Sequence, residues 1–159
     1  MKNFGKTILT FAAAMIAAFS LTACQGGGSK STVDVAGLAD DLNAKTIKSD
    51  VLTETNPDML PTIYFFEDGQ VNESKTYMSS GATADEICVV KCVDENAAKA
   101  VTELFQTRVN NQSKLYESYN ADEVGKLADA IIKSSGSYAV LVVCDDYDEA
   151  GDLLKEAGF

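Results

Sequence analysis

The chain has no histidine and no tryptophan, and only two of its 159 residues are proline. Histidine is the usual general base near neutral pH and a frequent zinc ligand, so its absence excludes His-dependent zinc sites and Ser-His or Cys-His dyads. Basic residues are also scarce, at 13 against 24 acidic ones, for a net charge of −11. Because nucleic-acid binding depends on Lys and Arg that neutralise phosphates, this balance argues against a nucleic-acid partner.

The longest hydrophobic run lies at the N-terminus. Lys2 and Lys6 flank the start of the chain, residues 8–19 are almost all apolar, and Leu-Thr-Ala then precedes Cys24. A basic start, an apolar stretch and small residues are the parts of a secretory signal. The Leu-Thr-Ala-Cys sequence resembles a bacterial lipobox, in which Cys24 is lipidated on sulfur and begins the mature chain. The alternatives are an ordinary signal peptide or a membrane helix with a chance cysteine, although a span needs about 20 residues.

These features divide the chain into three parts. Residues 1–23 are expected to be a lipoprotein signal peptide, residues 24–32 a lipidated Cys and a Gly/Ser-rich flexible tether, and residues 33–159 a single domain. Cleavage removes two of the basic residues and none of the acidic ones, so the net charge changes from −11 to −13. Anionic headgroups repel such a domain. We therefore expect the lipid on Cys24 to hold the protein at the extracytoplasmic face of the cell membrane.

Hydrophobic spacing predicts several helices in the domain. Apolar residues at helical spacing over 35–42 predict a first helix, with Thr32 as its cap. A long helix is expected over 95–119, bent or broken by the polar residues 110–113, followed by a short helix through Ala128 and a last helix that carries Leu153 and Leu154. Residues 62–66 are apolar and aromatic, which favours a short strand or a buried loop.

The order of strands and helices is expected to occur twice. Strands over 75–81 and 86–93 precede the long helix, and strands over 130–136 and 138–144 precede the last one; both first strands end in Ser-Ser-Gly. This predicts a ββα internal repeat. The fold class is therefore α+β: a four-stranded or five-stranded antiparallel sheet with helices packed on one face, preceded by an N-terminal helix.

Four segments carry a resemblance to a known family. Residues 81–87, the long helix after them, Tyr119-Asn120 and residues 138–145 resemble the domain-of-unknown-function family numbered 4358. The likeness extends from about Val33 to Phe159. It implies a small lipoprotein or secreted protein, mostly from Gram-positive gut anaerobes, with a lipid anchor and one α+β domain. It implies no activity and no catalytic residues.

Three cysteines remain after lipidation. Cys88 and Cys92 share a strand face but lie about 13 Å apart, too far to bridge. Cys92 and Cys144 hold matching positions in the repeat, so adjacent strands would bring them near, and an exported protein permits a disulfide. Free, buried cysteines that act as small hydrophobic residues are the preferred interpretation, which leaves the Cys92–Cys144 disulfide open. Thiol catalysis is disfavoured because no histidine is available to form the thiolate.

The remaining candidate sites are acidic or loop residues. Asp145, Asp146, Asp148 and Glu149 follow a strand, where calcium binding is one interpretation and a solvated helix start is the favoured one. No serine-hydrolase or phosphate-loop motif occurs. The family-like loop 81–85 is the first place to look for an interaction surface, with Gly81, Thr83 and Asp85 as its residues. No metal site and no cofactor are predicted.

These observations predict a non-catalytic, membrane-anchored lipoprotein whose domain is a binding or interaction module of the cell envelope. One alternative is a small-ligand-binding lipoprotein associated with a transporter. A less favoured alternative is a hydrolase that uses carboxylates alone. A cleft with two carboxyl groups and a raised pKa would favour the hydrolase, and a closed apolar pocket would favour the ligand carrier.

Overall fold

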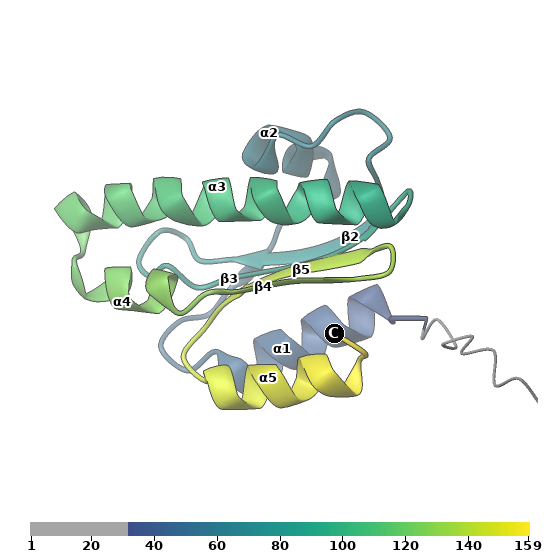
Figure 1. Cartoon of the computed structure of the whole chain (residues 1–159). Helices are drawn as coiled ribbons and strands as arrows, with labels where there is room; N and C mark the ends of the chain where they lie inside the picture. Colours follow the sequence, from purple (N-terminus) through teal and green to yellow (C-terminus); the bar gives the residue numbers. More distant parts are fainter. Residues whose placement is uncertain (1–31) are drawn as a thin grey trace, which may run out of the picture.

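A five-stranded antiparallel sheet lies between two layers of helices, with α2 and α3 on one side and α1 and α5 on the other (Figure 1). The structure is a computed structural model and describes residues 32–159. The elements in chain order are α1 (Val35–Thr46), β1 (Thr53–Glu54), the 3₁₀ turn η1 (Pro57–Met59), α2 (Leu60–Tyr64), β2 (Val71–Met78), β3 (Glu86–Cys92), α3 (Glu95–Tyr119), α4 (Asp122–Ala128), β4 (Ile131–Ser135), β5 (Tyr138–Val143) and α5 (Tyr147–Glu156). The predicted α+β class is confirmed.

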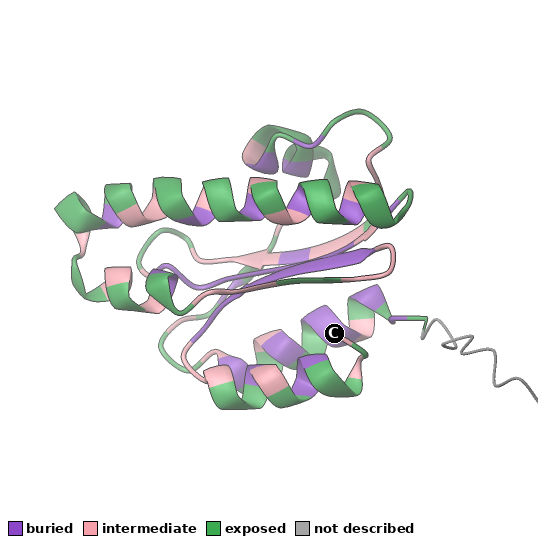
Figure 2. Ribbon diagram, viewed as in Figure 1, coloured by how far each residue is buried: buried purple, intermediate pink, exposed green. Residues whose placement is uncertain are grey.

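The sheet order is β1-β2-β3-β5-β4, so β3 and β5 occupy its centre. Side chains alternate between its two faces. On one face Cys88, Val90 and Leu141 pack under α2, α3 and α4, and on the other face Val89 and Val140 pack against α1 and α5. Figure 2 shows this directly, with the buried surfaces of both helical layers turned toward the buried central strands. The prediction that the helices pack on one face is therefore wrong, because both faces of the central strands are apolar.

The ββα order does occur twice, as β2-β3-α3 and β4-β5-α5, but the two units send their helices to opposite faces. The neighbouring strands β3 and β5 are antiparallel, with Glu86 opposite Val143 and Lys91 opposite Tyr138. Cys92 and Cys144 consequently lie at opposite ends of the two strands and on opposite faces of the sheet. The even-numbered residues of β3 share a face with the odd-numbered residues of β5, so Cys92 and Cys144 face opposite sides although they match in the sequence repeat.

Aspartates cap the three long helices. The carboxylates of Asp34, Asp94 and Asp146 accept hydrogen bonds from backbone N–H groups in the first turns of α1, α3 and α5. Such capping satisfies N–H groups that have no partner within the helix. Asp34, and not the predicted Thr32, is the cap of α1. Helix α3 has the predicted bounds and continues unbroken through the polar residues 110–113, of which Asn110 and Asn111 are exposed.

Residues 62–66 were predicted as a strand or loop and instead contain most of α2. Both prolines lie at helix starts, Pro57 in η1 and Pro61 in α2, where the missing N–H costs nothing. Phe65 ends α2 in the left-handed conformation, with φ of 63°. Among the helices of residues 32–159, none has the length and apolar character needed to cross a membrane.

Candidate functional site

The loop between β2 and β3 is held in place by a carboxylate that the sequence did not single out. Asp50 accepts hydrogen bonds from the hydroxyls of Ser79 at 2.6 Å and Thr83 at 3.0 Å. The Ser79 oxygen in turn accepts from the backbone N–H groups of Gly81 and Thr83. The hydrogen bond from Ser79 lowers the pKa of Asp50. Gly81 has a φ of 105°, a left-handed conformation that favours glycine.

The three predicted loop residues differ in exposure. Gly81 is exposed and Thr83 is half-buried, whereas Asp85 is buried and its side chain is directed inward to Lys126. The ammonium of Lys126 lies 3.0 Å from an oxygen of Asp85, 2.9 Å from Asp145 and 3.4 Å from Glu123. Asp85 therefore anchors the loop to α4 and is not available for contact with a partner.

Lys126 and Ser49 are in contact as a Ser-Lys pair would be, since the ammonium donates to the Ser49 hydroxyl at 3.2 Å. Burial alone would lower the pKa of Lys126, but the hydrogen bonds and charges of Asp145 and Asp85 outweigh it and raise the pKa. A catalytic lysine base needs the opposite shift, toward neutrality. The arrangement therefore keeps Lys126 protonated, so that it acts as a cation that joins three carboxylates.

The acidic residues after β5 also serve this network. Asp145 accepts from the backbone N–H groups of Lys48 and Ser49 at 2.5 and 2.7 Å, and Asp146 pairs with Lys48 at 2.7 Å. Burial would raise the pKa of Asp145, but the hydrogen bonds from Lys126, Lys48 and Ser49 lower it well below its usual range. Within residues 32–159, no group of three or more Cys, Asp or Glu side chains is arranged to hold a metal ion.

A second buried ion pair lies at the start of β3. Glu86, whose side chain is 7% exposed, accepts two hydrogen bonds from Arg108 Nε and one from Nη2 on α3, the last at 2.9 Å. The hydroxyl of Tyr64 donates to the same carboxylate at 2.7 Å. Burial of Tyr64 raises the pKa of its hydroxyl well above the usual value, which keeps this donor protonated. Glu86 is thus fully engaged by cation and hydroxyl donors.

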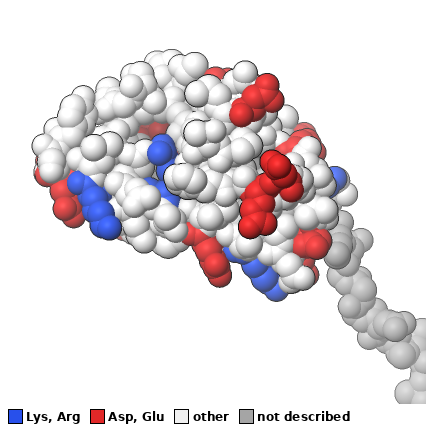
Figure 3. Space-filling view, turned by 90° about the horizontal axis from the view of Figure 1, so that it is seen from above, with Lys and Arg blue, Asp and Glu red and all other residues white. Residues whose placement is uncertain are grey.

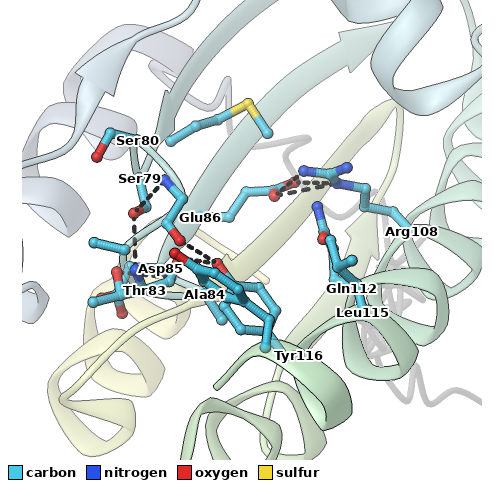
Figure 4. A pocket seen from close by; sticks show the side chains of 14 residues that line it. Ser79, Ser80, Thr83, Ala84, Asp85, Glu86, Arg108, Gln112, Leu115 and Tyr116 are labelled. Carbon is cyan, nitrogen blue, oxygen red and sulfur yellow. Dashed lines mark hydrogen bonds and ion pairs between the residues drawn. The ribbon is translucent and has the colours of Figure 1, made fainter. Parts of the chain in front are cut away.

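A groove of about 600 Å³ opens between the 79–86 loop and the C-terminal half of α3. We call it the loop groove; its lining residues are Met78, Ser79, Ser80, Gly81, Ala82, Thr83, Ala84, Asp85, Glu86, Arg108, Gln112, Leu115, Tyr116 and Tyr119. Figure 4 shows Arg108, Gln112, Leu115 and Tyr116 facing the loop from one helix. In Figure 3, which looks onto the α3 face, the surface is hollowed at the end remote from residue 32.

The groove has a polar floor and an apolar rim. Arg108 and Glu86 form the floor as a compensated pair, while Leu115 and Tyr119 on the rim are 61% and 69% exposed. The Tyr116 hydroxyl donates to the carbonyl oxygen of Thr83 and joins α3 to the loop. Exposed aromatic and aliphatic side chains beside a rigid concave surface are typical of contact sites.

The family of the chain follows from a match over a stretch of residues that includes the loop groove. Residues 45–144 match the family described as Domain of unknown function (DUF4358). The chain belongs to this family. No curated protein and no solved structure was found to match the chain. In this DUF4358 member, the matched span contains the loop groove and Lys126 but none of α5, so both buried ion pairs lie within the family's own region.

The three cysteines of the matched span, Cys88, Cys92 and Cys144, are free and buried, as the preferred interpretation held. Burial raises the pKa of Cys88 to about 12 and those of Cys92 and Cys144 to about 11. A disulfide between Cys92 and Cys144 is incompatible with their places on opposite faces of the sheet. The predicted lipidation site Cys24 lies outside the described residues.

Sequence reasoning missed Arg108, Gln112 and Lys126. A signal for the first two was present, because Arg108, Gln112, Leu115 and Tyr119 recur at helical spacing and define one face of α3. Glu86 also stood out as a carboxylate at the start of a strand that is otherwise buried. The signal for Lys126 was incomplete, since Glu123 lies one turn before it on α4 but Asp85 and Asp145 come from distant segments of the chain.

Proposed function

We propose that this protein is a lipid-anchored, extracytoplasmic lipoprotein whose DUF4358 domain is a non-catalytic binding module of the cell envelope, with the loop groove as its contact surface. The observation that carries the proposal is the exposed pair Leu115 and Tyr119 beside a loop held rigid from both sides. The charges near the groove are already compensated by Arg108 and Lys126, so a partner gains contact area there without having to neutralise a buried charge.

The place of the groove agrees with an anchored protein. Residue 32 and the start of α1 lie at one end of the sheet, whereas the 79–86 loop and the end of α3 lie at the other (Figure 1). A tether that ends at residue 32 would direct the loop groove away from the membrane, toward partners in the envelope or the medium. The membrane contact itself is assigned to the lipid on Cys24.

The anchor is tested by fractionation of cells that express the Cys24→Ala variant. We expect the wild-type chain to lose its signal peptide and to carry lipid in the membrane fraction, and the variant to keep its signal peptide and to carry no lipid. Wild-type processing and membrane retention of Cys24→Ala would overturn the lipid anchor. This result would leave the role of the groove to be decided by the second experiment.

The groove is tested by site-specific photocrosslinking in intact cells. A benzophenone amino acid replaces Tyr119 in one variant and Val93 in a control; these side chains are 69% and 59% exposed, and Val93 lies outside the groove. We expect a discrete adduct at position 119, lost when Leu115→Asp is added, and none at position 93. Equal adducts at both positions, or none at either, would contradict the groove as the contact surface.

A small-ligand carrier associated with a transporter is the second candidate. The volume of about 600 Å³ lies in the range of small-molecule sites, although the loop groove is open and not a closed apolar pocket. Native mass spectrometry of the purified chain separates the two: a bound small molecule that Leu115→Asp releases would favour the carrier. The carboxylate hydrolase is not favoured, because the pKa values of Asp50, Asp145 and Asp146 are lowered and a general acid needs a raised one.

A further inference from the structure

Strand β2 has a partner along only part of its outer edge. β1 pairs with its last residues, with Glu54 opposite Tyr77, and the Thr55 N–H donates to the Thr76 carbonyl oxygen at 2.9 Å. Within the described chain, Val71 and residues 73–75 pair only with β3 on the inner side, and the register is irregular between Val71 and Glu73. An unpaired strand edge presents N–H and C=O groups that can form hydrogen bonds with an added strand.

A proline ends the pairing of β1. If the register of Glu54 with Tyr77 continued, Pro57 would lie opposite Ser74. Proline has no N–H to donate at that position, so the ladder cannot continue. The chain instead turns into η1, where the Asn56 side chain accepts from the Asp58 N–H at 3.0 Å. In an antiparallel sheet, the N–H and C=O groups of every second residue point to the same neighbouring strand. The backbone groups of Thr76 point toward β1, so those of Ser74, two residues earlier, point toward the vacant edge.

A hollow of about 520 Å³ lies beside this vacant edge. We call it the edge hollow; it is lined by Pro57, Asp58, Leu60, Pro61, Phe66, Glu67, Asp68, Gly69, Val71, Asn72, Glu73 and Ser74. Buried Leu60 and Phe66 contribute apolar surface, and four of the lining residues are acidic: Asp58, Glu67, Asp68 and Glu73. No Lys or Arg side chain lines it. None of these four carboxylates takes part in an ion pair within residues 32–159.

The basic residues nearest along the strands are engaged elsewhere. Lys75 on β2 is 2.7 Å from Glu54 and 3.9 Å from Asp40, on the α1 side of the sheet. Lys91 is paired in register with Glu73, but its ammonium lies over the ring of Tyr138 at 5.9 Å. The edge hollow therefore combines unpaired backbone groups, an apolar wall and uncompensated negative charge.

We propose that the edge hollow and residues 71–75 of β2 dock an extended, basic segment of a partner protein, which pairs with β2 as an added strand. Main-chain hydrogen bonds to an edge strand provide affinity, and alternate side chains of the segment provide specificity. Lys or Arg side chains of the segment reach the carboxylates of Asp58, Glu67, Asp68 and Glu73, and the β2 edge accommodates about five residues, or about 16 Å. A second copy of this chain is disfavoured because it would set identical acidic edges against each other.

The charge component is tested with a fluorescent nonapeptide of alternating Lys and Val and the full chain in nonionic detergent. The triple variant Asp58→Asn, Glu67→Gln, Glu73→Gln removes charges from the edge hollow. A matched control, Glu103→Gln, Glu117→Gln, Asp152→Asn, removes three exposed charges elsewhere. We expect the first variant to weaken peptide binding by at least tenfold and the control by less than twofold. Equal weakening in both variants would reduce the effect to net charge and overturn the proposal.

The strand component is tested by amide hydrogen exchange of the same complex. We expect the peptide to slow exchange of the Ser74 amide at least tenfold, while amides of β4, at the opposite edge of the sheet, keep their rates. Peptide binding without protection of Ser74 would overturn the added strand. A dimer of the chain that protects Ser74 before peptide is added would assign the edge to a second copy and also overturn the proposal.

Discussion

The loop groove and the edge hollow are similar in size but opposite in electrostatics. Around the loop groove, each buried carboxylate has a cation: Glu86 has Arg108, and Asp85 has Lys126. Around the edge hollow, the four carboxylates are exposed and have no ion-pair partner within the described chain. The carboxylates near the loop groove therefore stabilise the fold through ion pairs, whereas those of the edge hollow remain available to a partner.

The largest expected effect comes from removing the cation behind the loop. Lys126→Met leaves Asp85 buried without its ion pair, and breaking a buried pair typically costs about 3–5 kcal/mol. We expect a loss of this order in the free energy of unfolding, measured by urea denaturation. The control is Lys99→Met, whose pair with Glu95 is exposed at both side chains and should cost at most about 0.5 kcal/mol. A loss below about 1 kcal/mol for Lys126→Met would mean that the buried pair contributes little more to stability than the exposed pair.

A pH titration should sharpen the same contrast. The pKa of Asp145 is lowered in the folded chain, so its contribution to stability is complete above the unfolded value of about 3.9 and is lost as pH falls below it. We expect unfolding midpoints of the wild type to fall steeply below about pH 4. Asp145→Asn should be less stable at pH 7 and show a shallower slope, while Asp148→Asn, exposed on α5, should retain the wild-type slope. Parallel curves for wild type and Asp145→Asn would contradict the assignment.

Removal of charge at the edge hollow should raise the free energy of unfolding, by less than the substitutions at Lys126 and Asp145 lower it. The variant Asp58→Asn, Glu67→Gln, Glu73→Gln relieves repulsion among exposed like charges, so we expect a gain of at most about 1 kcal/mol in stability. Thermal unfolding at low salt measures it, and added salt should reduce the gain. A clear destabilisation would mean that these carboxylates support the fold, as those near the loop groove do.

The smallest expected effect is on the reactivity of the thiols. It measures whether solvent enters the core through the loop groove or the edge hollow. In a Cys24→Ala background, Cys88, Cys92 and Cys144 should not react with iodoacetamide at pH 8 in the folded chain, because all are buried and burial raises their pKa values to about 11 or 12. Mass spectrometry should detect three adducts only after unfolding in urea. Rapid native labelling of Cys88 would show that the core under α3 is open to solvent.

The strands and α3 were predictable because their patterns are local. Alternating or continuous apolar residues with Ser-Ser-Gly turns located β2 to β5 within a few residues, and Asp94 with the apolar stripe located α3. The faces of the sheet were not predictable in the same way. β5 is buried over its whole length, so its sequence carries no alternation that could tell which side each residue faces.

The site was predictable only in part, for a related reason. The 81–85 loop was located, but the residues that fix it were not: Asp50 and Lys126 are 33 and 41 positions away from their partners Thr83 and Asp85. A single charged residue has no sequence pattern that identifies its partner across the fold. The short helix α2 was missed because its apolar, aromatic residues resemble a strand.

The pairing of β3 with β5 at the centre of the sheet has a consequence for how the chain folds. Each outer pair, β2 with β3 and β4 with β5, joins strands that are neighbours in sequence, whereas β3 meets β5 only after α3 and α4 have intervened. Local hairpins close quickly and distant pairings slowly, because the intervening chain must lose its freedom first. We therefore expect the two hairpins to form early and β3 to pair with β5 last. This central pairing is then the step that sets the folding rate.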